Sequence, residues 1–262
     1  MAVEVCVLAS GSSGNCTMVR HGGSVLMIDA GIPGREIFRR AEAWGVTPGM
    51  VAGICVSHEH ADHVAGIAKL VEEFRLPVYA NRGTSEGMAR QEALREMPCR
   101  IFSTGQAFEV GLFRVEPFSV PHDAYEPVGF VVEAGGLRVG VVTDMGMATS
   151  LIRERLRSCR AVVVESNHDE QLVRNAKRPE FLKQRILGRQ GHLSNKAAAA
   201  LLAEIAGPHL EAVFLAHLSA ECNKGDLAWH TVRTGLDKAG HGHVQVLLTY
   251  ADRASEVWRP AS

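Results

Sequence analysis

Short apolar runs and amphipathic stretches follow one another along this chain, which predicts a succession of strands and helices. Runs of about four to eight apolar residues that end at Gly, Asp or Ser predict buried strands. Apolar residues at helical spacing predict helices, and Ile37, Phe38, Ala41 and Trp44 form one such set. The expected strands are Val3–Leu8, Val25–Ile28, Val51–Val56, Phe108–Phe118, Val128–Glu133, Leu137–Val142, Ala161–Glu165, Ala212–Ala216 and Val244–Thr249. The expected helices are Arg35–Trp44, Val64–Phe74, Ser150–Arg157, Asn195–Ala206 and Asp226–Ala239, with a long polar helical segment after Glu165.

This succession of elements predicts one α/β domain. The 262 residues, 46% of them hydrophobic, can bury a full core but are too few for two ordinary domains with linkers. Strands dominate the middle third, where Gly135 and Gly136 predict a hairpin turn, and they alternate with helices elsewhere. We therefore expect a single domain over residues 1–262, with mixed β-sheets inside and helices outside.

Composition and charge exclude several classes of protein. The formal net charge of −1 excludes a globally basic protein, so any contact with nucleic acid requires a local basic patch. The six cysteines contain no C-x-x-C pair, which argues against a zinc ribbon or a disulfide framework. The N-terminus has no basic and apolar leader, and no apolar run reaches about 18 residues. We expect a soluble cytoplasmic protein without a membrane segment.

The twelve histidines point to the chemistry, because several of them follow strands. The segment His58-x-His60-x-Asp62-His63 places three imidazoles and a carboxylate within six residues after an apolar strand. Such nitrogen and oxygen ligands suit zinc, manganese or iron without a thiolate. In an extended segment His58 and His60 point the same way and can bind one ion, while Asp62 and His63 begin the next helix and can bind a second. The alternative is a polar helix cap in which the histidines occur by chance.

This motif, together with the preceding strand that ends in Asp29-Ala30-Gly31, resembles the metallo-β-lactamase superfamily over nearly the whole chain. Four further motifs resemble the YycJ (WalJ) group, whose members are regarded as metal-dependent DNA exonucleases related to ribonuclease Z and ribonuclease J. They are Leu8 to Asn15, Glu165-x-Asn167-His168-Asp169, Gly191-His192-Leu193-Ser194-Asn195 and His217-Leu218-Ser219-x-Glu221-Cys222-Asn223. The resemblance implies a four-layer αβ/βα sandwich of two mixed sheets flanked by helices, with two divalent metal ions (Zn2+, Mn2+ or Fe2+) at one edge of the sheets.

The resemblance also implies the remaining ligands, since a two-metal site needs about seven. His122 matches the third histidine of the first metal. Asp144, at the end of a strand, matches a bridging aspartate, although an aspartate there can also cap the following helix. His168, His192 and His217 are candidates for the last ligand, and His217 is favoured because it directly follows an apolar strand. We expect one metal to be bound by His58, His60 and His122, the other by Asp62, His63 and His217, and both by Asp144.

Other residues are expected to contact the substrate. His192 resembles the histidine of ribonuclease Z relatives that contacts the phosphate or protonates the leaving group, and Asp62 and His192 are the predicted catalytic residues. The loop from Ser10 to Asn15 can donate N–H groups and hydroxyls to a phosphate, or can simply be a tight strand connection. The role of His168 stays open between substrate contact and orientation of a ligand. The predicted substrate-binding residues are Ser12, Ser13, Asn15, His168, Ser194, Asn195, Ser219 and Asn223.

One stretch supplies the local basic patch that the neutral total requires. Between Arg174 and Arg189 six residues are basic and only Glu180 is acidic. This stretch lies between two histidine motifs, so it can place a cationic rim beside the metals and follow a phosphodiester backbone. The alternative is a solvated helical face. Phe181 is its one aromatic residue, so base stacking is not strongly indicated there.

The ligand types predict a binuclear metal-dependent hydrolase that cleaves phosphodiesters with a hydroxide activated by two metals. A DNA substrate, attack from an end with the 5′ end preferred, and a role in DNA repair are implied by the resemblance alone. A ribonuclease or a small cyclic-phosphate phosphodiesterase shares the same metal core. A non-catalytic metal-binding protein and a diiron redox protein are alternatives from other classes. The diiron branch is disfavoured because it has glutamate where this chain has His60, and Glu59 is the variable residue of the motif.

Overall fold

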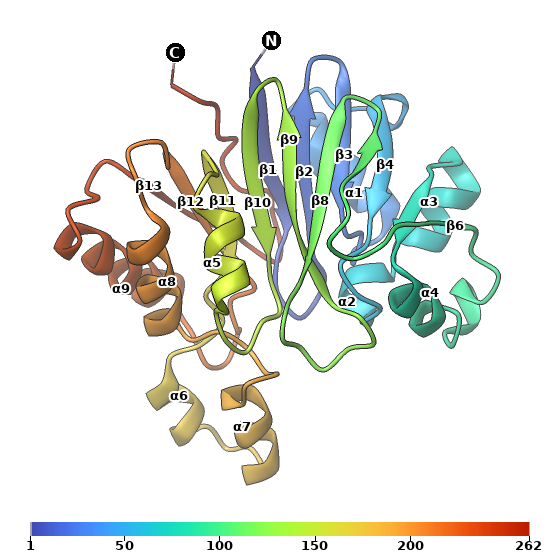
Figure 1. The fold of residues 1–262 in the computed structure, drawn as a ribbon. Coiled ribbons are helices and arrows are strands. Elements are labelled where there is room, and N and C mark those ends of the chain that lie inside the picture. Colours follow the sequence, from blue (N-terminus) through green and yellow to red (C-terminus); the bar gives the residue numbers. More distant parts are fainter. Residues whose placement is uncertain (1, 262) are drawn as a thin grey trace.

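Two β-sheets packed face to face form the centre of the molecule (Figure 1). The structure is a computed structural model that describes residues 2–261. The first sheet contains, in spatial order, β1 (Val3–Ala9), β2 (Cys16–His21), β3 (Ser24–Ile28), β4 (Val51–Cys55), β5 (Val78–Ala80) and β6 (Cys99–Ile101). The second contains β13 (Gln245–Leu248), β12 (Ala212–Ala216), β11 (Ala161–Glu165), β10 (Leu137–Val142), β9 (Val128–Ala134), β8 (Phe113–Ser119) and β7 (Phe108–Val110). Both sheets combine antiparallel and parallel pairs, as predicted.

Helices cover the outer face of each sheet (Figure 1). The first sheet is accompanied by α1 (Gly34–Glu42), α2 (Ala61–Val64), α3 (Ile67–Phe74) and α4 (Arg82–Met88), with the short 3-10 helices η1 (Pro48–Met50) and η2 (Glu92–Leu94). The second sheet is covered by α5 (Ser150–Leu156), α8 (Asn195–Ile205) and α9 (Gly225–Lys238). Helices α6 (Glu170–Asn175) and α7 (Glu180–Leu187) project from the sandwich at the lower end in Figure 1.

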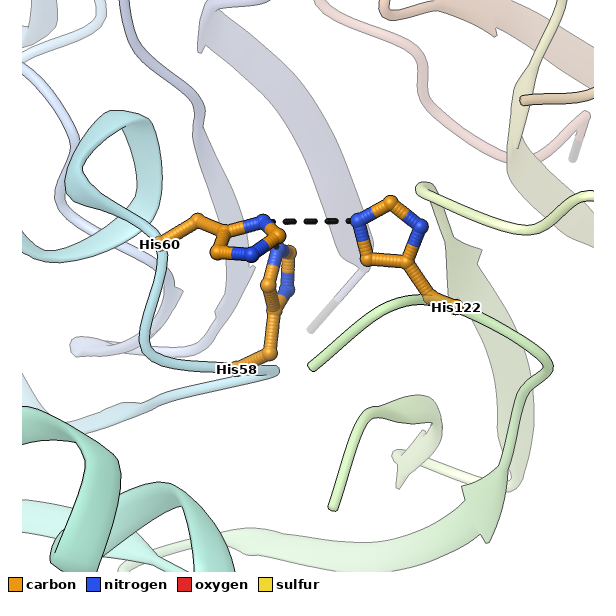
Figure 2. A group of neighbouring side chains, drawn as sticks. All are labelled: His58, His60 and His122. Atoms are coloured by element: carbon orange, nitrogen blue, oxygen red, sulfur yellow. Dashed lines mark hydrogen bonds between the residues drawn. The ribbon is translucent and has the colours of Figure 1, made fainter. Parts of the chain in front are cut away.

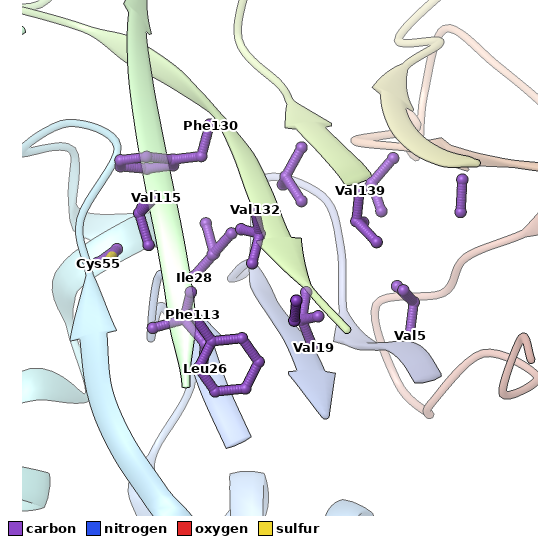
Figure 3. Close-up of a cluster of buried hydrophobic side chains, with 14 of the residues drawn as sticks. Val5, Val19, Leu26, Ile28, Cys55, Phe113, Val115, Phe130, Val132 and Val139 are labelled. Carbon is purple, nitrogen blue, oxygen red and sulfur yellow. The ribbon is translucent and has the colours of Figure 1, made fainter. Parts of the chain in front are cut away.

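Three layers of buried side chains join these four layers. The central one lies between the sheets and includes Val5, Leu26, Phe113 and Phe130 (Figure 3). A second cluster packs the first sheet against its helices, and a third packs the other sheet against α5, α8 and α9. Every residue of β11 is buried, as expected for a parallel strand that is covered on both faces. The predicted four-layer αβ/βα sandwich is therefore confirmed.

Several element boundaries differ from the prediction. Strand β2 lies between the two strands that were expected to be consecutive. It was not predicted because its sequence, which includes Thr17 and Arg20, contains no long apolar run. The expected strand Phe108–Phe118 is two strands, which turn at Gly111 with φ 59°. The expected helix Val64–Phe74 is interrupted at Gly66, where a Cβ atom would lie 2.2 Å from the carbonyl oxygen of Ile32.

In two regions the hydrophobic pattern did not predict the elements correctly. Between residues 75 and 107 the structure has β5, α4, η2 and β6, for which no element was predicted. The polar helical segment after Glu165 is two short helices, and the second begins after Pro179. Strands of three residues are too short for a reliable alternation, and proline fixes the start of α7.

One edge of the sandwich collects the carboxyl ends of many strands. Strands β1 and β3 are separated by one antiparallel neighbour and therefore point the same way, and β4 is parallel to β3. By the same rule β8, β10, β11 and β12 share a direction. The loops that follow these strands meet at this edge, since His217 donates its backbone N–H to Ser10 Oγ across the two sheets at 2.7 Å.

Two further observations concern the described residues. Within residues 2–261 no helix is both long and apolar enough to cross a membrane, and the six cysteines are free thiols. The single domain predicted for residues 1–262 stays a prediction, and its first and last residues, Met1 and Ser262, lie outside the described range.

Candidate metal centre and active site

The segment between β4 and α2 and the loop after β8 bring three imidazoles together. His58 Nε2 lies 3.1 Å from His60 Nδ1, which lies 3.4 Å from His122 Nε2 (Figure 2). Two nitrogens bound to one zinc ion at about 2.0–2.1 Å and a tetrahedral angle lie about 3.3–3.4 Å apart. The spacing of these three side chains therefore fits the ligands of a single metal ion. Burial and the nearby His63 hold the pKa of His58 well below its usual range, so its ring is neutral, as a ligand requires.

A second group of donors lies beside the first. Asp62 Oδ2 is 3.3 Å from His217 Nε2 and 3.6 Å from His63 Nε2. The ligand atoms of these three residues all lie within 4.8 Å of one another. Asp62 and His63 belong to α2, while His217 directly follows β12, so the two sheets contribute to one site.

Asp144 lies between the two groups. Its Oδ2 is 3.1 Å from His63 Nε2, and its Oδ1 is 3.5 Å from His217 Nε2 and 3.8 Å from His122 Nε2. Asp144 Oδ2 is buried and accepts no hydrogen bond. Burial opposes its charge, but His217 and His63 hold the pKa of this carboxyl well below its usual range. A buried, ionised carboxylate with an oxygen left free among imidazoles fits a ligand shared by two metals.

The backbone is strained where it delivers these side chains. Of the described non-glycine residues, four have positive φ: Asp29 (59°), Arg75 (54°), Asp144 (54°) and His217 (54°). Asp29 and His217 directly follow β3 and β12, Asp144 is the second residue after β10, and each left-handed residue costs about 1–2 kcal/mol. Such strain persists where surrounding contacts enforce it, and it concentrates at functional sites.

Two side chains orient the histidines of the first sheet. Asp29 Oδ2 lies 2.7 Å from His63 Nδ1 and accepts the Ser57 hydroxyl at 2.8 Å. Ser57 Oγ is also 3.0 Å from His58 Nδ1. Burial lowers the pKa of His63, but Asp29 and Asp144 outweigh it and raise that pKa to about 10. These contacts leave both Nε2 atoms directed toward the candidate metals.

Glu165 has the corresponding role on the second sheet. It is fully buried, and its Oε1 lies 2.7 Å from His192 Nδ1 and 3.3 Å from His217 Nδ1. Burial opposes the charge of Glu165, but His192 and His217 lower its pKa to about 2. Sequence reasoning quoted Glu165 within a motif and assigned it no role. The available signal was an acidic residue that directly ends the buried strand β11.

His192, the predicted catalytic histidine, lies beside two of the candidate ligands. Its ring centroid is 5.2 Å from that of His217 and 5.4 Å from that of His122. The side chain is 25% exposed, and its Nδ1 is engaged by Glu165. Burial lowers the pKa of His192, but Glu165 outweighs it and raises that pKa above its usual value. A histidine that is charged more readily than usual is suited to donate a proton.

Asn15 lies among the ligands rather than on the surface. Its Nδ2 donates to Asp62 Oδ2 at 3.3 Å and lies 3.0 Å from His63 Nε2, and its Oδ1 accepts the Gly11 N–H at 2.9 Å. Ser12 and Ser13, by contrast, are exposed at the tip of the same loop. The loop therefore combines a structural contact to the ligands with two hydroxyls that are accessible from solvent.

The remaining predicted substrate residues mostly stabilise the loops around the candidate ligands. Asn195 and Asn223 are buried and hydrogen-bonded to each other at 2.8 and 3.0 Å. Ser194 caps α8 by accepting the Ala197 N–H, and Ser219 accepts the Cys222 N–H at 3.0 Å. His168 is 1% exposed, and its Nδ1 has no hydrogen-bond partner. The structure thus places these side chains in loop-stabilising positions and does not bring them into the ligand cluster.

Glu59 does not point at the metals. Its Oε1 accepts the backbone N–H of Tyr125 at 2.9 Å, and its side chain lies against Gly87 of α4. His60 therefore supplies the middle donor of the ligand segment, which does not favour the diiron alternative.

The basic stretch forms α6, α7 and the loop after them. Arg178 pairs with Glu221 and Arg185 with Asp123, at 2.7 and 2.6 Å. In the described part of the chain Arg174, Lys177 and Arg189 form no such ion pair. A cavity of about 190 Å³ separates α7 from the site, and its lining includes Arg185 and His192. Of the free cations, Arg174 lies in α6, Lys177 between the two helices and Arg189 after α7. The cations that line the cavity, Arg178 and Arg185, are the paired ones.

The sandwich and its paired histidine and aspartate clusters define a protein of the metallo-β-lactamase class. Residues 26–217 match the family described as the beta-lactamase superfamily domain, and the chain belongs to this family. It is 35% identical over 248 residues to exodeoxyribonuclease YycJ of Bacillus anthracis, and this alignment covers 92% of each of the two chains. It is 30% identical to exodeoxyribonuclease WalJ of Streptococcus pneumoniae serotype 2, over 90% of this chain and 89% of that one. The resemblance inferred from the motifs is thereby confirmed.

A solved structure supports the fold independently. The metallo-beta-lactamase fold protein YhfI from Bacillus subtilis superposes with a TM-score of 0.73 at 16% identity. The match covers 98% of this chain and 99% of that protein. At this identity the comparison speaks for the architecture alone.

Proposed function

We propose that the protein is a metal-dependent exodeoxyribonuclease that hydrolyses phosphodiester bonds from an end of DNA, with the 5′ end preferred. The observation that carries this proposal is the position of Asp144 between two groups of three donors, which supplies a full ligand set for two metals. The names of the YycJ and WalJ relatives support DNA as the substrate. A role in DNA repair and a cytoplasmic location stay predictions.

Seven residues would hold two divalent ions, which we propose to be zinc, manganese or iron, because all seven donors are nitrogen or oxygen atoms. When bound, these ions supply Lewis-acid activation of water and of the scissile phosphate. His58, His60 and His122 would hold one ion, Asp62, His63 and His217 would hold the other, and Asp144 would contribute to both.

His192 donates the proton to the leaving oxygen in this proposal. Its Nδ1 is held by Glu165 at 2.7 Å, so Nε2 is the nitrogen that faces the substrate. Glu165 outweighs burial and raises the pKa of His192 above its usual value, which makes the protonated, proton-donating form more accessible. Asp62 contributes as a ligand whose Oδ2 is held by Asn15.

The substrate contacts divide into two sets. The exposed Ser12 and Ser13 offer hydroxyls to a phosphate, and the half-buried Ser219 accepts the Cys222 N–H but keeps its own O–H to donate. The free cations of the basic stretch, Arg174, Lys177 and Arg189, follow the backbone. We propose that the buried members of the predicted set position these loops. They are Asn15, His168, Ser194, Asn195 and Asn223.

Digestion of end-labelled DNA and RNA tests the proposal. Single- and double-stranded substrates labelled at either end are incubated with chelated protein to which zinc, manganese or iron is added in turn. We expect labelled mononucleotides from 5′-labelled DNA and no activity from His60→Ala. Release from RNA alone identifies a ribonuclease, and inertness on every polymer while a small phosphodiester is cleaved contradicts the exonuclease proposal.

A further inference from the structure

An exposed aromatic ring lies on the loop that carries the metal ligand His122. Tyr125, three residues further on, is 48% exposed. The guanidinium of Arg90, which follows α4, lies over this ring at 4.9 Å from the centroid. Neither residue was singled out by the sequence, and the proposed hydrolysis does not use them. The guanidinium covers one face of the ring, and the half-exposed remainder of Tyr125 is accessible to solvent.

The backbone of Tyr125 is fixed by two glutamates. Glu59, which is 9% exposed and stands between His58 and His60, accepts the Tyr125 N–H at 2.9 Å. Glu126, the next residue, accepts the Gly83 N–H at 3.0 Å. An exposed ring on a loop would otherwise be mobile, so these bonds hold the position of Tyr125 relative to the metal ligands.

Arg90 is tied to the same point. The side-chain amide of Gln91 donates to the backbone carbonyl of Glu59 at 2.6 Å. The backbone of Tyr125 and the residue next to Arg90 are therefore both hydrogen-bonded to Glu59. Glu59 itself lies between His58 and His60, two of the proposed metal ligands. A surface cation–π contact without such anchoring would have no fixed place beside the site.

Two glycines of α4 leave room for these glutamates. A Cβ atom on Gly87 would lie 2.5 Å from Glu59 Cγ, and one on Gly83 would lie 2.5 Å from Glu126 Cβ. Glycine weakens a helix relative to alanine, so two of them in a seven-residue helix need a reason. Here the reason is steric, because larger residues would displace the glutamates that hold the Tyr125 loop.

The same loop also contacts the basic helix α7. On its other side Asp123 pairs with Arg185 of α7 at 2.6 Å. Figure 1 shows the loop between β8 and β9 at the lower end of the sandwich, between α4 and the projecting α6 and α7. The aromatic pair and the basic helices thus flank the candidate metal ligands on two sides.

We propose that Tyr125 and Arg90 form a platform on which an unpaired nucleobase of the substrate stacks, beside the scissile phosphate. Bases stack on aromatic rings largely without regard to sequence, and the arginine adds attraction to the neighbouring phosphate. In a closed duplex end the terminal base is already stacked on its neighbour, so the platform selects single-stranded ends. This inference rests on the proposed function and specifies its substrate.

Binding of single-stranded DNA tests the platform. Metal-loaded protein is titrated with oligonucleotides that carry 2-aminopurine at one of the first three positions and phosphorothioate linkages that slow hydrolysis. We expect quenching of the fluorophore, and Tyr125→Ala to abolish it and weaken binding about fivefold or more. Tyr125→Phe keeps the ring and is expected to match the wild type.

An oligonucleotide with an abasic residue at the quenched position separates stacking from a structural effect. The wild type and Tyr125→Ala are expected to bind it equally. Unchanged binding of the 2-aminopurine strand by Tyr125→Ala, or an equal loss on the abasic strand, overturns the platform. Cleavage of unmodified DNA by the wild type is measured separately. Stacking without cleavage therefore contradicts the nuclease proposal alone, and cleavage without stacking contradicts the platform alone.

Discussion

Glu165 accepts a hydrogen bond from His192 Nδ1 at 2.7 Å, and the same carboxylate oxygen lies 3.3 Å from Nδ1 of His217. One buried side chain thus orients both a proposed metal ligand and the proposed proton donor. Its other oxygen accepts the backbone N–H groups of Met145 and Leu193 at 2.9 and 3.0 Å. The carboxylate is therefore held on both sides, and the two histidines depend on one anchor.

Glu165→Gln is expected to lower kcat/KM by about 10- to 100-fold. The amide can accept at one atom only, so its NH2 group must face either the histidine or the two backbone N–H donors. Steady-state hydrolysis of labelled DNA and metal content by plasma mass spectrometry check this together. Glu204→Gln, which removes an exposed ion pair with Arg153, is the matched control and should change neither quantity. A Glu165→Gln enzyme with the wild-type rate and metal content contradicts the assigned role.

Replacement of Asp144 separates its ligand role from its backbone role. Both Asp144→Asn and Asp144→Ala are expected to lose metal and activity, because the shared carboxylate is gone. Only the alanine variant should lose further stability, by about 1 kcal/mol, since asparagine tolerates the left-handed backbone at φ 54° better. Metal content and urea denaturation in excess chelator measure the two effects. Full metal loading of Asp144→Asn would exclude the proposed bridging position.

The metal-free protein is expected to lose stability as the pH rises from about 6.5 toward 10. The folded-state pKa of His63 is raised to about 10 from 6.5, so folding favours its protonated form. This contribution is fully present below pH 6.5 and is lost as the pH passes the folded-state value. Metal affinity should change in the opposite direction, because ligand histidines must be neutral.

Urea denaturation of chelated protein at several pH values measures this dependence. His63→Gln should flatten the decrease, since the glutamine does not titrate. A free energy of unfolding that rises with pH in chelated wild-type protein would contradict the assigned charge on His63.

Part of the site could be predicted because its residues are contiguous or directly end strands. His58 to His63 lie in one motif, and His217 follows an apolar run. Asn15, Asp29 and Glu165 received no role or a different one, because each acts through a partner far along the chain. Asn15 contacts Asp62, Asp29 contacts His63 and Glu165 contacts His192. No pattern along the chain identifies such partners before the strand ends are brought together.

The fold shows the same division. Long apolar strands such as β11 and β12 were predicted closely, since burial on both faces requires continuous apolar residues. Strands β5 and β6 have three residues each and owe their pairing to neighbours in the sheet. Their existence follows from the register of the whole sheet and not from local preference.

The free cations of the basic stretch, in and between α6 and α7, are expected to bind DNA phosphates. Arg174→Ala combined with Lys177→Ala should weaken binding of single-stranded DNA and reduce the slope of log K against log salt by about 0.7 per lost contact. Lys238→Ala, an exposed cation at the end of α9, should leave the slope unchanged. Fluorescence anisotropy at several salt concentrations measures the slope, and an unchanged slope in the double variant excludes these helices from the binding surface.

Gly31 is expected to be indispensable for the metal centre. A Cβ atom at this position would lie 1.7 Å from the carbonyl oxygen of Asp62. The Gly31 N–H donates to Asn15 O at 2.8 Å and the Asn15 N–H donates to Asp62 O at 2.7 Å, so three segments meet without space for a side chain. Gly31→Ala should therefore displace α2, lower the free energy of unfolding by about 3 kcal/mol or more and abolish metal binding.

Gly23→Ala is the matched control, because nothing lies within 4 Å of a Cβ atom there, and it should change the free energy of unfolding by about 0.5 kcal/mol at most. Guanidinium denaturation and metal content of the two variants measure this contrast, and a Gly31→Ala protein with wild-type stability would show that the contact with Asp62 is not close.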